Sequence, residues 1–169
     1  MRLLTLALLL IVPFGTSAEV LSGRVVRVVD GDTVYVLDAA KTQHKVRLAG
    51  IDAPERGQPF GTKSKERMAE FVAGKEVEVR WDKEDRWGRV VGTVWVASPD
   101  CRRMVCPKTL DAGLALITSG LAWHFKRYAH EQTEEERLRY AFAEEEARAR
   151  KVGLWRDPDP APPWEWRRR

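Results

Sequence analysis

Residues 23–37, GRVVRVVDGDTVYVL, decide the fold class because they place two β-type segments around one turn signal. Gly23–Val29 and Thr33–Leu37 are rich in valine, and Asp30-Gly31-Asp32 separates them. An Asp-Gly pair between two apolar runs is a strong hairpin signal. The stretch therefore predicts two antiparallel strands joined by a turn that carries two acids.

Three more β-type segments follow this hairpin. Lys45–Leu48 predicts a third short strand, and Glu76–Trp81 and Val90–Val96 form a second hairpin-like pair. In Glu76–Trp81, apolar and charged residues alternate, as they do in a strand with one buried face. Five short segments of this kind in roughly 75 residues favour a small barrel over a sandwich.

Three helices interrupt and follow the strands. The predicted ranges are Thr62–Ala73, Leu110–Ser119 and Glu134–Val152. Apolar residues at helical spacing support each range. In the third helix the spacing predicts a packed face made of Leu138, Ala141, Phe142, Glu145 and Ala149. Gly153-Leu154 predicts a Schellman stop after it. Strands followed by helices make this a mainly β, α+β chain.

Residues 1–18 carry the three-part pattern of a secretory signal peptide. Arg2 provides the positive start, Leu3–Val12 is apolar, and small residues end at Ala18, where we expect cleavage. A buried core helix or a retained anchor is the alternative, but the apolar run is too short to span a bilayer. The pattern predicts an exported protein, periplasmic or secreted, that has no membrane segment after cleavage.

The remaining residues divide into a domain and a tail. Residues 19–155 hold the predicted strands and helices, and residues 156–169 form the C-terminal tail. Residues 157–163 include four prolines, and Trp164-Glu165-Trp166 and three arginines follow. Such a tail is either a disordered end or an extended strap packed through its tryptophans. We favour the strap.

Two cysteines, Cys101 and Cys106, lie in a polar stretch. In an oxidising compartment they would close a small loop as a disulfide. A zinc site is the alternative, but two further ligands are lacking nearby and the chain has only three histidines.

Length and composition set the remaining limits. The 169 residues suit one domain, and 44% hydrophobic residues permit a packed core. No repeat at a fixed period is present, which disfavours a solenoid. The formal net charge of +4 is compatible with a phosphate-bearing partner. The basic excess is largest across residues 100–128, which include a stretch of mixed aromatic and basic residues.

Acids and arginines gather in three clusters: 30–33 (DGDT), 47–55 (RLAGIDAPE) and 85–89 (DRWGR). Each alone is compatible with an ordinary turn or strand position. Together, Asp32 and Asp52 would supply carboxylates for a hard cation such as Ca²⁺. Glu55 would orient or deprotonate a water, and Arg47 and Arg89 would hold phosphate oxygens. The combination predicts phosphodiester hydrolysis.

These clusters resemble the staphylococcal nuclease-like family of Ca²⁺-dependent nucleases. The resemblance continues in Gly120-Leu121-Ala122-Trp123 and Gly153-Leu154-Trp155, and it runs in order from Val20 to Trp155. It implies a five-stranded Greek-key OB barrel with about three packed helices. It also implies an endonuclease acting on DNA, with RNA as a possible second substrate, that leaves 3′-phosphate ends.

The resemblance also implies roles for individual residues. Asp32 and Asp52 match the family's metal-binding carboxylates, and Ala53 would give its backbone carbonyl to the metal. The best-known members have threonine at this last position, but a carbonyl ligand does not need the side chain. Glu55 matches the residue assigned as general base, an assignment that is debated. Arg47 and Arg89 match the transition-state arginines, and Asp30 matches a supporting acid that does not bind the metal.

One aromatic and basic stretch is the candidate for base binding. In the family a tyrosine-bearing segment after the second helix helps to hold the nucleotide, and here that stretch is 123–128 (WHFKRY). Interleaved aromatic and basic residues would stack bases and contact phosphates. The alternative is a core-facing Trp123 and Phe125 with a basic edge. The expected substrate-binding residues are Trp87, His124, Phe125, Lys126 and Arg127, although Trp87 would also suit packing on the barrel and His124 a structural role.

Two hypotheses of different classes follow. The first is an exported, Ca²⁺-dependent endonuclease that acts as a monomer. The second is a non-catalytic OB-fold protein of the cell envelope that binds nucleic acid. A pure binding protein has no need of Asp32, Asp52, Glu55, Arg47 and Arg89 together, so the set favours the enzyme.

Overall fold

A computed structural model describes residues 19–169, so the predicted signal peptide lies outside the described residues. The strands are β1 (Glu19–Val28), β2 (Thr33–Leu37), β3 (Gln43–Leu48), β4 (Ile51–Asp52), β5 (Glu76–Glu84), β6 (Val90–Ala97), β7 (Lys108–Asp111) and β8 (Trp123–His124). The α-helices are α1 (Gly61–Val72), α2 (Ala112–Thr118), α3 (Glu134–Ala149) and α4 (Pro163–Trp166). Two 3₁₀ turns, η1 (Lys126–Glu131) and η2 (Gly153–Arg156), complete the chain.

Five strands close into a barrel. The sheet order is β3-β2-β1-β5-β6-β7, and a parallel pairing between β3 and β6 joins the ends of the first five strands. The interior is filled by valines that alternate along the strands, such as Val34 and Val36 on β2 and Val94 and Val96 on β6. Their branched side chains suit a pleated, buried surface. The predicted five-stranded barrel of a mainly β, α+β protein is confirmed, with β7 as an added strand.

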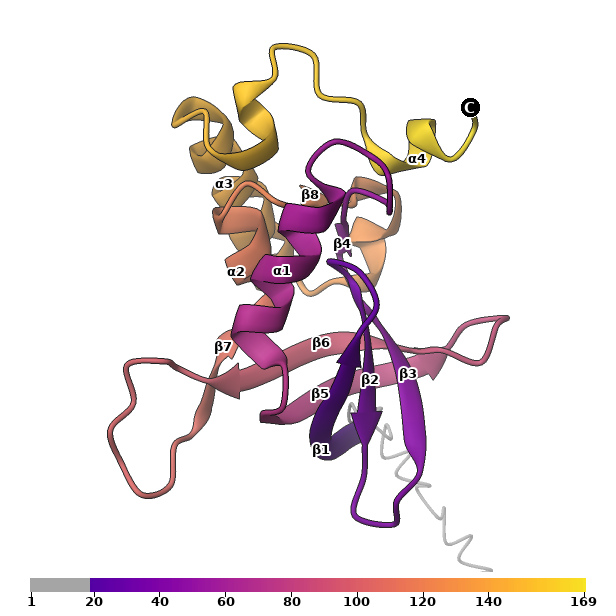
Figure 1. Ribbon diagram of the computed structural model, residues 1–169, viewed down its shortest axis with the longest axis vertical. Coiled ribbons are helices and arrows are strands. Elements are labelled where there is room, and N and C mark those ends of the chain that lie inside the picture. Colours follow the sequence, from indigo (N-terminus) through magenta and orange to yellow (C-terminus); the bar gives the residue numbers. More distant parts are fainter. Residues whose placement is uncertain (1–18) are drawn as a thin grey trace, which may run out of the picture.

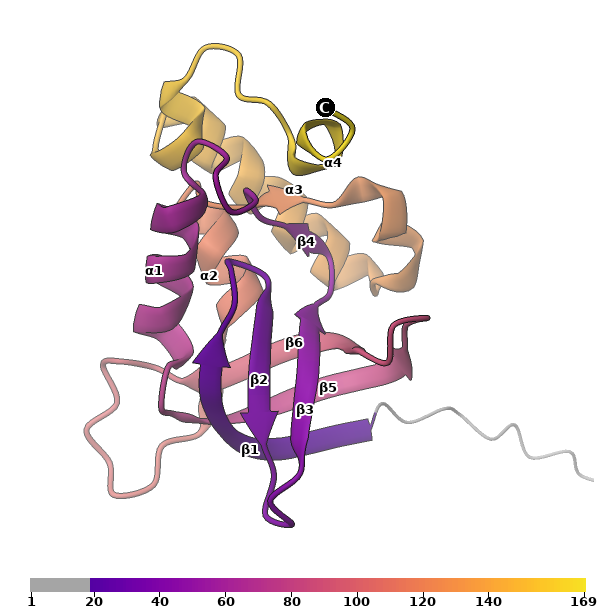
Figure 2. The same cartoon turned by 45° about the vertical axis from the view of Figure 1, so that its right-hand side comes forward.

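Strand β1 belongs to both halves of the barrel. Its first residues pair with β5 and its last residues pair with β2, and Arg24 lies in both registers. The register with β2 shifts between Val25 and Arg27, where the strand bends. Figure 2 shows this bend, which turns the β2–β3 hairpin away from β5 and β6. The bend lets one strand reach around the barrel and brings the end of β1 to the turn that carries the acids.

The helices gather at one end of the barrel, where α1, α2 and α3 lie beside one another (Figure 1). Helix α2 begins at Ala112 and not at the predicted Leu110, because Leu110 and Asp111 pair with β6 as part of β7. Asp111 then caps the helix, since its Oδ1 accepts hydrogen bonds from the backbone N–H groups of Gly113 and Leu114. The Tyr140 hydroxyl donates to the other Asp111 oxygen at 2.8 Å and ties α3 to this cap.

The packed face of α3 differs from the prediction. The buried residues are Tyr140, Ala143, Glu144 and Ala147. Leu138 and Phe142 are 62% and 66% exposed, so the predicted apolar face was wrong. Small alanines let the helix approach closely, and the two polar residues of this face have partners inside the protein: Tyr140 donates to Asp111, and Glu144 accepts from the His124 backbone N–H. Polar residues with buried partners thus define the face.

The stop after α3 also differs from the prediction. The helix ends at Ala149, and Lys151, with φ 50°, takes the left-handed position of a Schellman motif. The Val152 and Lys151 N–H groups donate to the carbonyls of Ala147 and Arg148. Gly153 has a different task, because a Cβ there would lie 2.0 Å from the carbonyl oxygen of Gly120. The two glycines allow the ends of α2 and α3 to touch.

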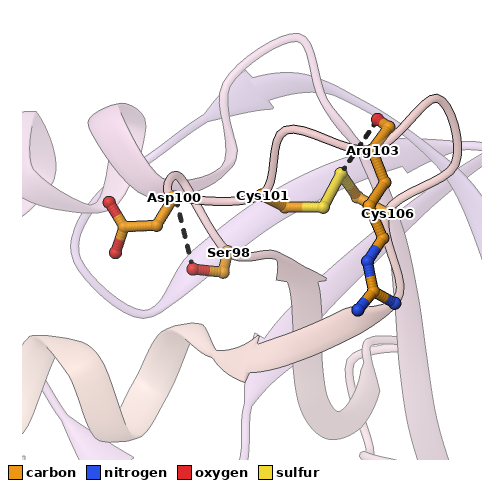
Figure 3. Close-up of a disulfide and its surroundings, with 5 residues drawn as sticks. All are labelled: Ser98, Asp100, Cys101, Arg103 and Cys106. Atoms are coloured by element: carbon orange, nitrogen blue, oxygen red, sulfur yellow. Dashed lines mark hydrogen bonds between the residues drawn. A yellow bond between two sulfur atoms is a disulfide. The ribbon is translucent and has the colours of Figure 1, made fainter.

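A disulfide joins Cys101 and Cys106 in the loop between β6 and β7, as predicted. Figure 3 shows the bridge beside Ser98 and Asp100, whose backbone N–H donates to the Ser98 hydroxyl. Both sulfurs are used in the bond, so the zinc alternative is excluded. The loop projects from the side of the barrel away from α4 (Figure 1). Across residues 19–169, every helix is too short or too polar to cross a membrane.

The chain after η2 returns over the molecule as the C-terminal strap, residues 157–169. Its last turn, α4, lies above β4 in both views (Figures 1 and 2). Trp164 packs edge-on against Trp123, with ring centroids 5.5 Å apart, and stacks on Phe125 at 5.5 Å. The Gln58 side-chain amide donates to the Ala161 carbonyl at 2.7 Å. These contacts hold the strap against the end of the barrel that carries the acids.

Candidate active site

Two buried aspartates come together where β1 and β4 end and β2 begins. Asp32 lies in the β1–β2 turn and is 6% exposed, and Asp52 ends β4 and is fully buried. The Ala53 backbone N–H donates to Asp32 Oδ2 at 2.8 Å, which joins the two segments directly. Gly31 makes this approach possible, because a Cβ there would lie 2.7 Å from the Ala53 side chain and 2.0 Å from the Ser64 hydroxyl. The turn residue expected from sequence is therefore also a packing requirement.

Arg47 lies between the two carboxylates. Its Nη1 is 3.2 Å from Asp32 Oδ2, and its Nη2 donates to Asp52 Oδ1 at 2.9 Å. Nη1 also donates to the backbone carbonyls of Leu48 and Ile51, both at 3.0 Å. One guanidinium thus pairs with two buried carboxylates and holds the start of β4 against the end of β3.

Burial shifts the acid chemistry of this centre. Burial, reinforced by the charge of Asp32, raises the pKa of Asp30 to about 6. The Asp30 carboxylate accepts a hydrogen bond from the Asp32 backbone N–H at 3.0 Å and so supports the turn. Burial also raises the pKa of Asp52, against the opposing effect of the arginines beside it. Acids withdrawn from water in this way favour a positively charged partner.

Glu55 joins the centre through a residue that sequence reasoning did not assign. Arg167, in the strap, places Nη2 2.7 Å from Asp52 Oδ2 and Nη1 3.2 Å from Asp52 Oδ1. The same Nη1 donates to a Glu55 carboxylate oxygen. The hydrogen bonds with Asp52 raise the pKa of Arg167, so the guanidinium is fully charged. The run of three terminal arginines was the available signal, but the carboxylate partners of Arg167 lie more than 100 positions away in the chain.

Gln58 positions Glu55 from the other side. Its Oε1 accepts a hydrogen bond from the Glu55 backbone N–H at 3.0 Å, while its amide nitrogen donates to the strap. Sequence reasoning did not single out this residue. Gln58 is 6% exposed, so both bonds are shielded from water. It couples the loop that carries Glu55 to the strap that carries Arg167.

Arg89 lies apart from this centre, at the tip of the β5–β6 hairpin. Its Nε donates to Asp85 Oδ2 at 2.7 Å, and Asp85 also accepts from the backbone N–H groups of Trp87 and Arg89. Within residues 19–169, no hydrogen bond or ion pair joins Arg89 to Asp32, Asp52 or Glu55. Trp87 is 65% exposed, with the Arg89 guanidinium 5.1 Å from its ring. The Arg86 guanidinium also lies over this ring, at 4.2 Å, so the hairpin presents an exposed tryptophan flanked by two arginines.

The predicted aromatic and basic stretch lines a cavity of about 340 Å³ beside the strap. Its walls are Trp123, His124, Phe125, Lys126, Arg127, Glu144, Arg148, Trp164 and Arg168. Lys126 and Arg148 both pair with the buried Glu144 carboxylate. The cavity combines aromatic surface with positive charge, which is the chemistry expected for holding a base and its phosphate.

Residues 123–128 divide between the two predicted roles, core packing and substrate binding. Trp123 is buried and packs on Trp155 with ring centroids 4.4 Å apart, as the core alternative expected. Phe125 is only half-buried and stacks on Trp164, and Arg127 is exposed. His124 is 2% exposed, and its Nε2 lies 2.8 Å from the Gln132 side-chain oxygen. His124 therefore lines the cavity but is almost completely buried.

The residues present fit a hard cation by their donor chemistry. Asp32, Asp52 and the Ala53 carbonyl would supply only oxygen ligands, which Ca²⁺ prefers. Within residues 19–169 no group of three or more histidine, cysteine, aspartate or glutamate side chains forms a ready cage. A cation here would need water or substrate oxygens to complete its shell, which suits a site that stays open to a phosphate.

Comparisons with known proteins agree on one family. Residues 45–157 match the family model described as staphylococcal nuclease homologue. A micrococcal nuclease of Shigella flexneri is 38% identical over 168 residues, covering 99% of this chain and 92% of that protein. Protein ParB of Escherichia coli is 42% identical over 148 residues, covering 88% of this chain and 80% of that protein. An uncharacterized endonuclease of Escherichia coli is 39% identical over 147 residues, covering 87% of this chain and 85% of that protein.

The family match begins within β3 and includes β5, β6 and all three main helices, whereas β1 and β2 precede it. It includes Arg47, Asp52, Glu55 and Arg89, and only Asp30 and Asp32 of the acid and arginine set precede it. The fold, the match and the relatives agree, and the chain belongs to the staphylococcal nuclease homologue family.

Proposed function

We propose that this chain is an exported, Ca²⁺-dependent endonuclease that hydrolyses phosphodiester bonds of DNA, with RNA as a second substrate, and leaves 3′-phosphate ends. One observation carries the proposal: Asp32 and Asp52 flank the guanidinium of Arg47 at the barrel end where Glu55 also lies. Relatives named micrococcal nuclease and endonuclease support the reaction class. Export rests on the signal-peptide pattern of residues 1–18.

Arg47 can hold a phosphate without leaving its place. A guanidinium has five N–H groups. Three of them donate to Leu48, Ile51 and Asp52, which leaves two with no such partner among residues 19–169. A phosphate oxygen that accepts these remaining donors would be fixed beside both aspartates. The aspartates and the Ala53 carbonyl would hold the cation, whose charge would stabilise the negative charge that builds up on the phosphate.

Glu55 is the candidate base. Its side chain is about one-third exposed, so a water molecule can reach it, in contrast to the buried Asp52. A carboxylate at this place would accept a proton from water as the water attacks phosphorus and the bond to the 5′-oxygen breaks. Arg89 would bring its guanidinium to the phosphate from the β5–β6 hairpin and stabilise the extra charge of the transition state. Phe125, Lys126 and Arg127 would contact the neighbouring nucleotide.

Digestion of supercoiled plasmid by the mature protein tests the proposal. With Ca²⁺ we expect nicking and linearisation, and with an excess of chelator we expect none. Glu55→Gln and Arg89→Ala should each lower the rate by about 10²–10³-fold, the usual effect of losing one electrostatic catalytic group. Arg24→Ala and Glu76→Gln, which change an exposed pair on β1 and β5, are matched controls and should keep full activity.

Three results would count against the proposal. Cutting that persists in chelator would exclude the cation. Full activity of both Glu55→Gln and Arg89→Ala would show that the site is assigned wrongly. Binding of DNA without cutting under any condition would favour the non-catalytic OB-fold protein.

A further inference from the structure

The strap brings a positive charge to the carboxylates that the proposed function gives to a cation. Arg167 faces Asp52 with both terminal nitrogens, at 2.7 Å from Oδ2 and 3.2 Å from Oδ1. It also donates to Glu55. A paired, charge-assisted contact of this kind is among the stronger polar interactions in proteins.

The two oxygens of Asp52 differ in their partners. Oδ1 accepts from Arg47, a residue of the barrel itself, as well as from Arg167. Within residues 19–169 the hydrogen-bond partner of Oδ2 is Arg167. Oδ2 is therefore the Asp52 oxygen that the barrel leaves for a ligand, and the strap occupies it.

A guanidinium and a divalent cation compete at this place. Both are attracted by the negative charge of Asp52, and two positive charges held by one carboxylate repel each other. Arg47 and Arg167 already bring two positive charges to Asp32, Asp52 and Glu55, which carry three negative charges. A divalent cation would make the positive charge larger than the negative charge. A cation that binds Asp52 through Oδ2 would therefore weaken the contacts of Arg167 by charge repulsion and favour their release.

The strap is held there by contacts that do not depend on Arg167. Trp164 packs on Trp123 and Phe125, and Gln58 bonds to the Ala161 carbonyl. Pro163 at the start of α4 is buried. The position of Arg167 is therefore set by the packing of three earlier strap residues, and the guanidinium alone can move without the strap coming off.

We propose that Arg167 is a built-in competitor of the divalent cation, which occupies Asp52 and Glu55 and is released when the cation binds. The inference rests on the proposed function, since it concerns the regulation of the same site. A phosphate near the strap would favour the release, because it offers the guanidinium a second anionic partner. Nucleic acid and cation would then strengthen each other's binding.

Calorimetric titration of the mature protein with Ca²⁺ tests the inference without measuring activity. Arg167→Ala and Arg167→Gln should each bind Ca²⁺ about tenfold or more tightly than the unchanged protein, the factor expected for the loss of one charge-assisted contact. Arg169→Ala is the matched control. It removes the same charge from the same tail, and the Arg169 guanidinium lies over Trp166, away from the carboxylates. Its affinity should stay close to that of the unchanged protein.

Equal Ca²⁺ affinity in the unchanged protein and both Arg167 variants would overturn the inference and leave the proposed function standing. A similar gain in Arg169→Ala would also overturn it, because the effect would then reflect overall tail charge. Absence of Ca²⁺ binding in every variant would overturn both this inference and the proposed cation site. Asp52→Asn should abolish binding in all cases where binding is seen.

Discussion

Replacing Arg47 with alanine should destabilise the fold as well as the proposed reaction. The change removes the guanidinium that lies between Asp32 and Asp52 and leaves Asp32 without its ion-pair partner. It also removes two hydrogen bonds to the carbonyls of Leu48 and Ile51, which hold the end of β3 against β4. Arg89 is assigned the same catalytic role but does not join separate segments of the fold, because its ion-pair partner is Asp85 in the same hairpin.

The expected loss of stability follows from the burial of the ion pairs that Arg47 makes. Removing one partner of a buried ion pair usually costs about 3–5 kcal/mol, because the other charge stays buried. Arg167 still faces Asp52, and the Ala53 N–H still donates to Asp32, so the lower end applies. We expect a loss of about 3 kcal/mol, which lowers the melting temperature of a domain of this size by about 6–12 °C. Arg89→Ala removes a pair that is more exposed and should cost no more than about 1 kcal/mol.

Thermal unfolding followed by circular dichroism, in chelator and again in excess Ca²⁺, measures both variants. In chelator Arg47→Ala should melt well below Arg89→Ala and the unchanged protein. Ca²⁺ should narrow the difference, because it would supply positive charge to the same carboxylates.

A melting temperature of Arg47→Ala within about 2 °C of the unchanged protein in chelator would contradict this prediction, because that shift corresponds to no more than about 1 kcal/mol. The two aspartates would then not depend on Arg47 for charge compensation. Equal destabilisation by Arg89→Ala would refute the distinction between the two arginines.

Two further predictions concern the scaffold. Tyr140→Phe should lower the free energy of unfolding by about 1.5–3 kcal/mol in urea titrations, because it leaves Asp111 Oδ2 buried without its donor. The nearby Phe142→Ala, on the exposed face of α3, should stay within about 0.5 kcal/mol, and the reverse order would contradict the assigned packing. A Cys101→Ser, Cys106→Ser variant should lose about 2 kcal/mol of stability, the loop-entropy value for a bridge with a sequence separation of 5, yet cut plasmid at the unchanged rate. A drop in its specific activity would show that the bridge supports the site.

The barrel and the central acids could be predicted from sequence because their signals are local. Alternating valines mark the strands, and Asp30-Gly31-Asp32 marks the turn. Asp32 follows β1 and Asp52 follows β3, and the two meet because these strands run in the same direction and end at the same edge of the barrel. The order of the motifs along the chain was then enough to name a family, which the comparisons confirmed.

The face of α3 and the role of the strap could not be predicted, because their partners are distant in sequence. Tyr140 is buried because Asp111, 29 positions earlier, accepts its hydroxyl. Hydrophobicity alone predicted that Leu138 and Phe142 would be buried, but both side chains are exposed. Arg167 meets Asp52 across 115 positions, so no spacing within the tail announces the contact.

The anchoring of the strap has a consequence for how the competition would respond to concentration. The span from Gly153, whose backbone touches Gly120, to Trp164, which packs on Trp123, is fixed at both ends and contains four prolines. Arg167 therefore meets Asp52 as an intramolecular ligand, at an effective concentration of order mM or higher that dilution cannot lower. The free cation concentration needed to displace it would therefore be the same in a dilute and in a concentrated solution of the protein.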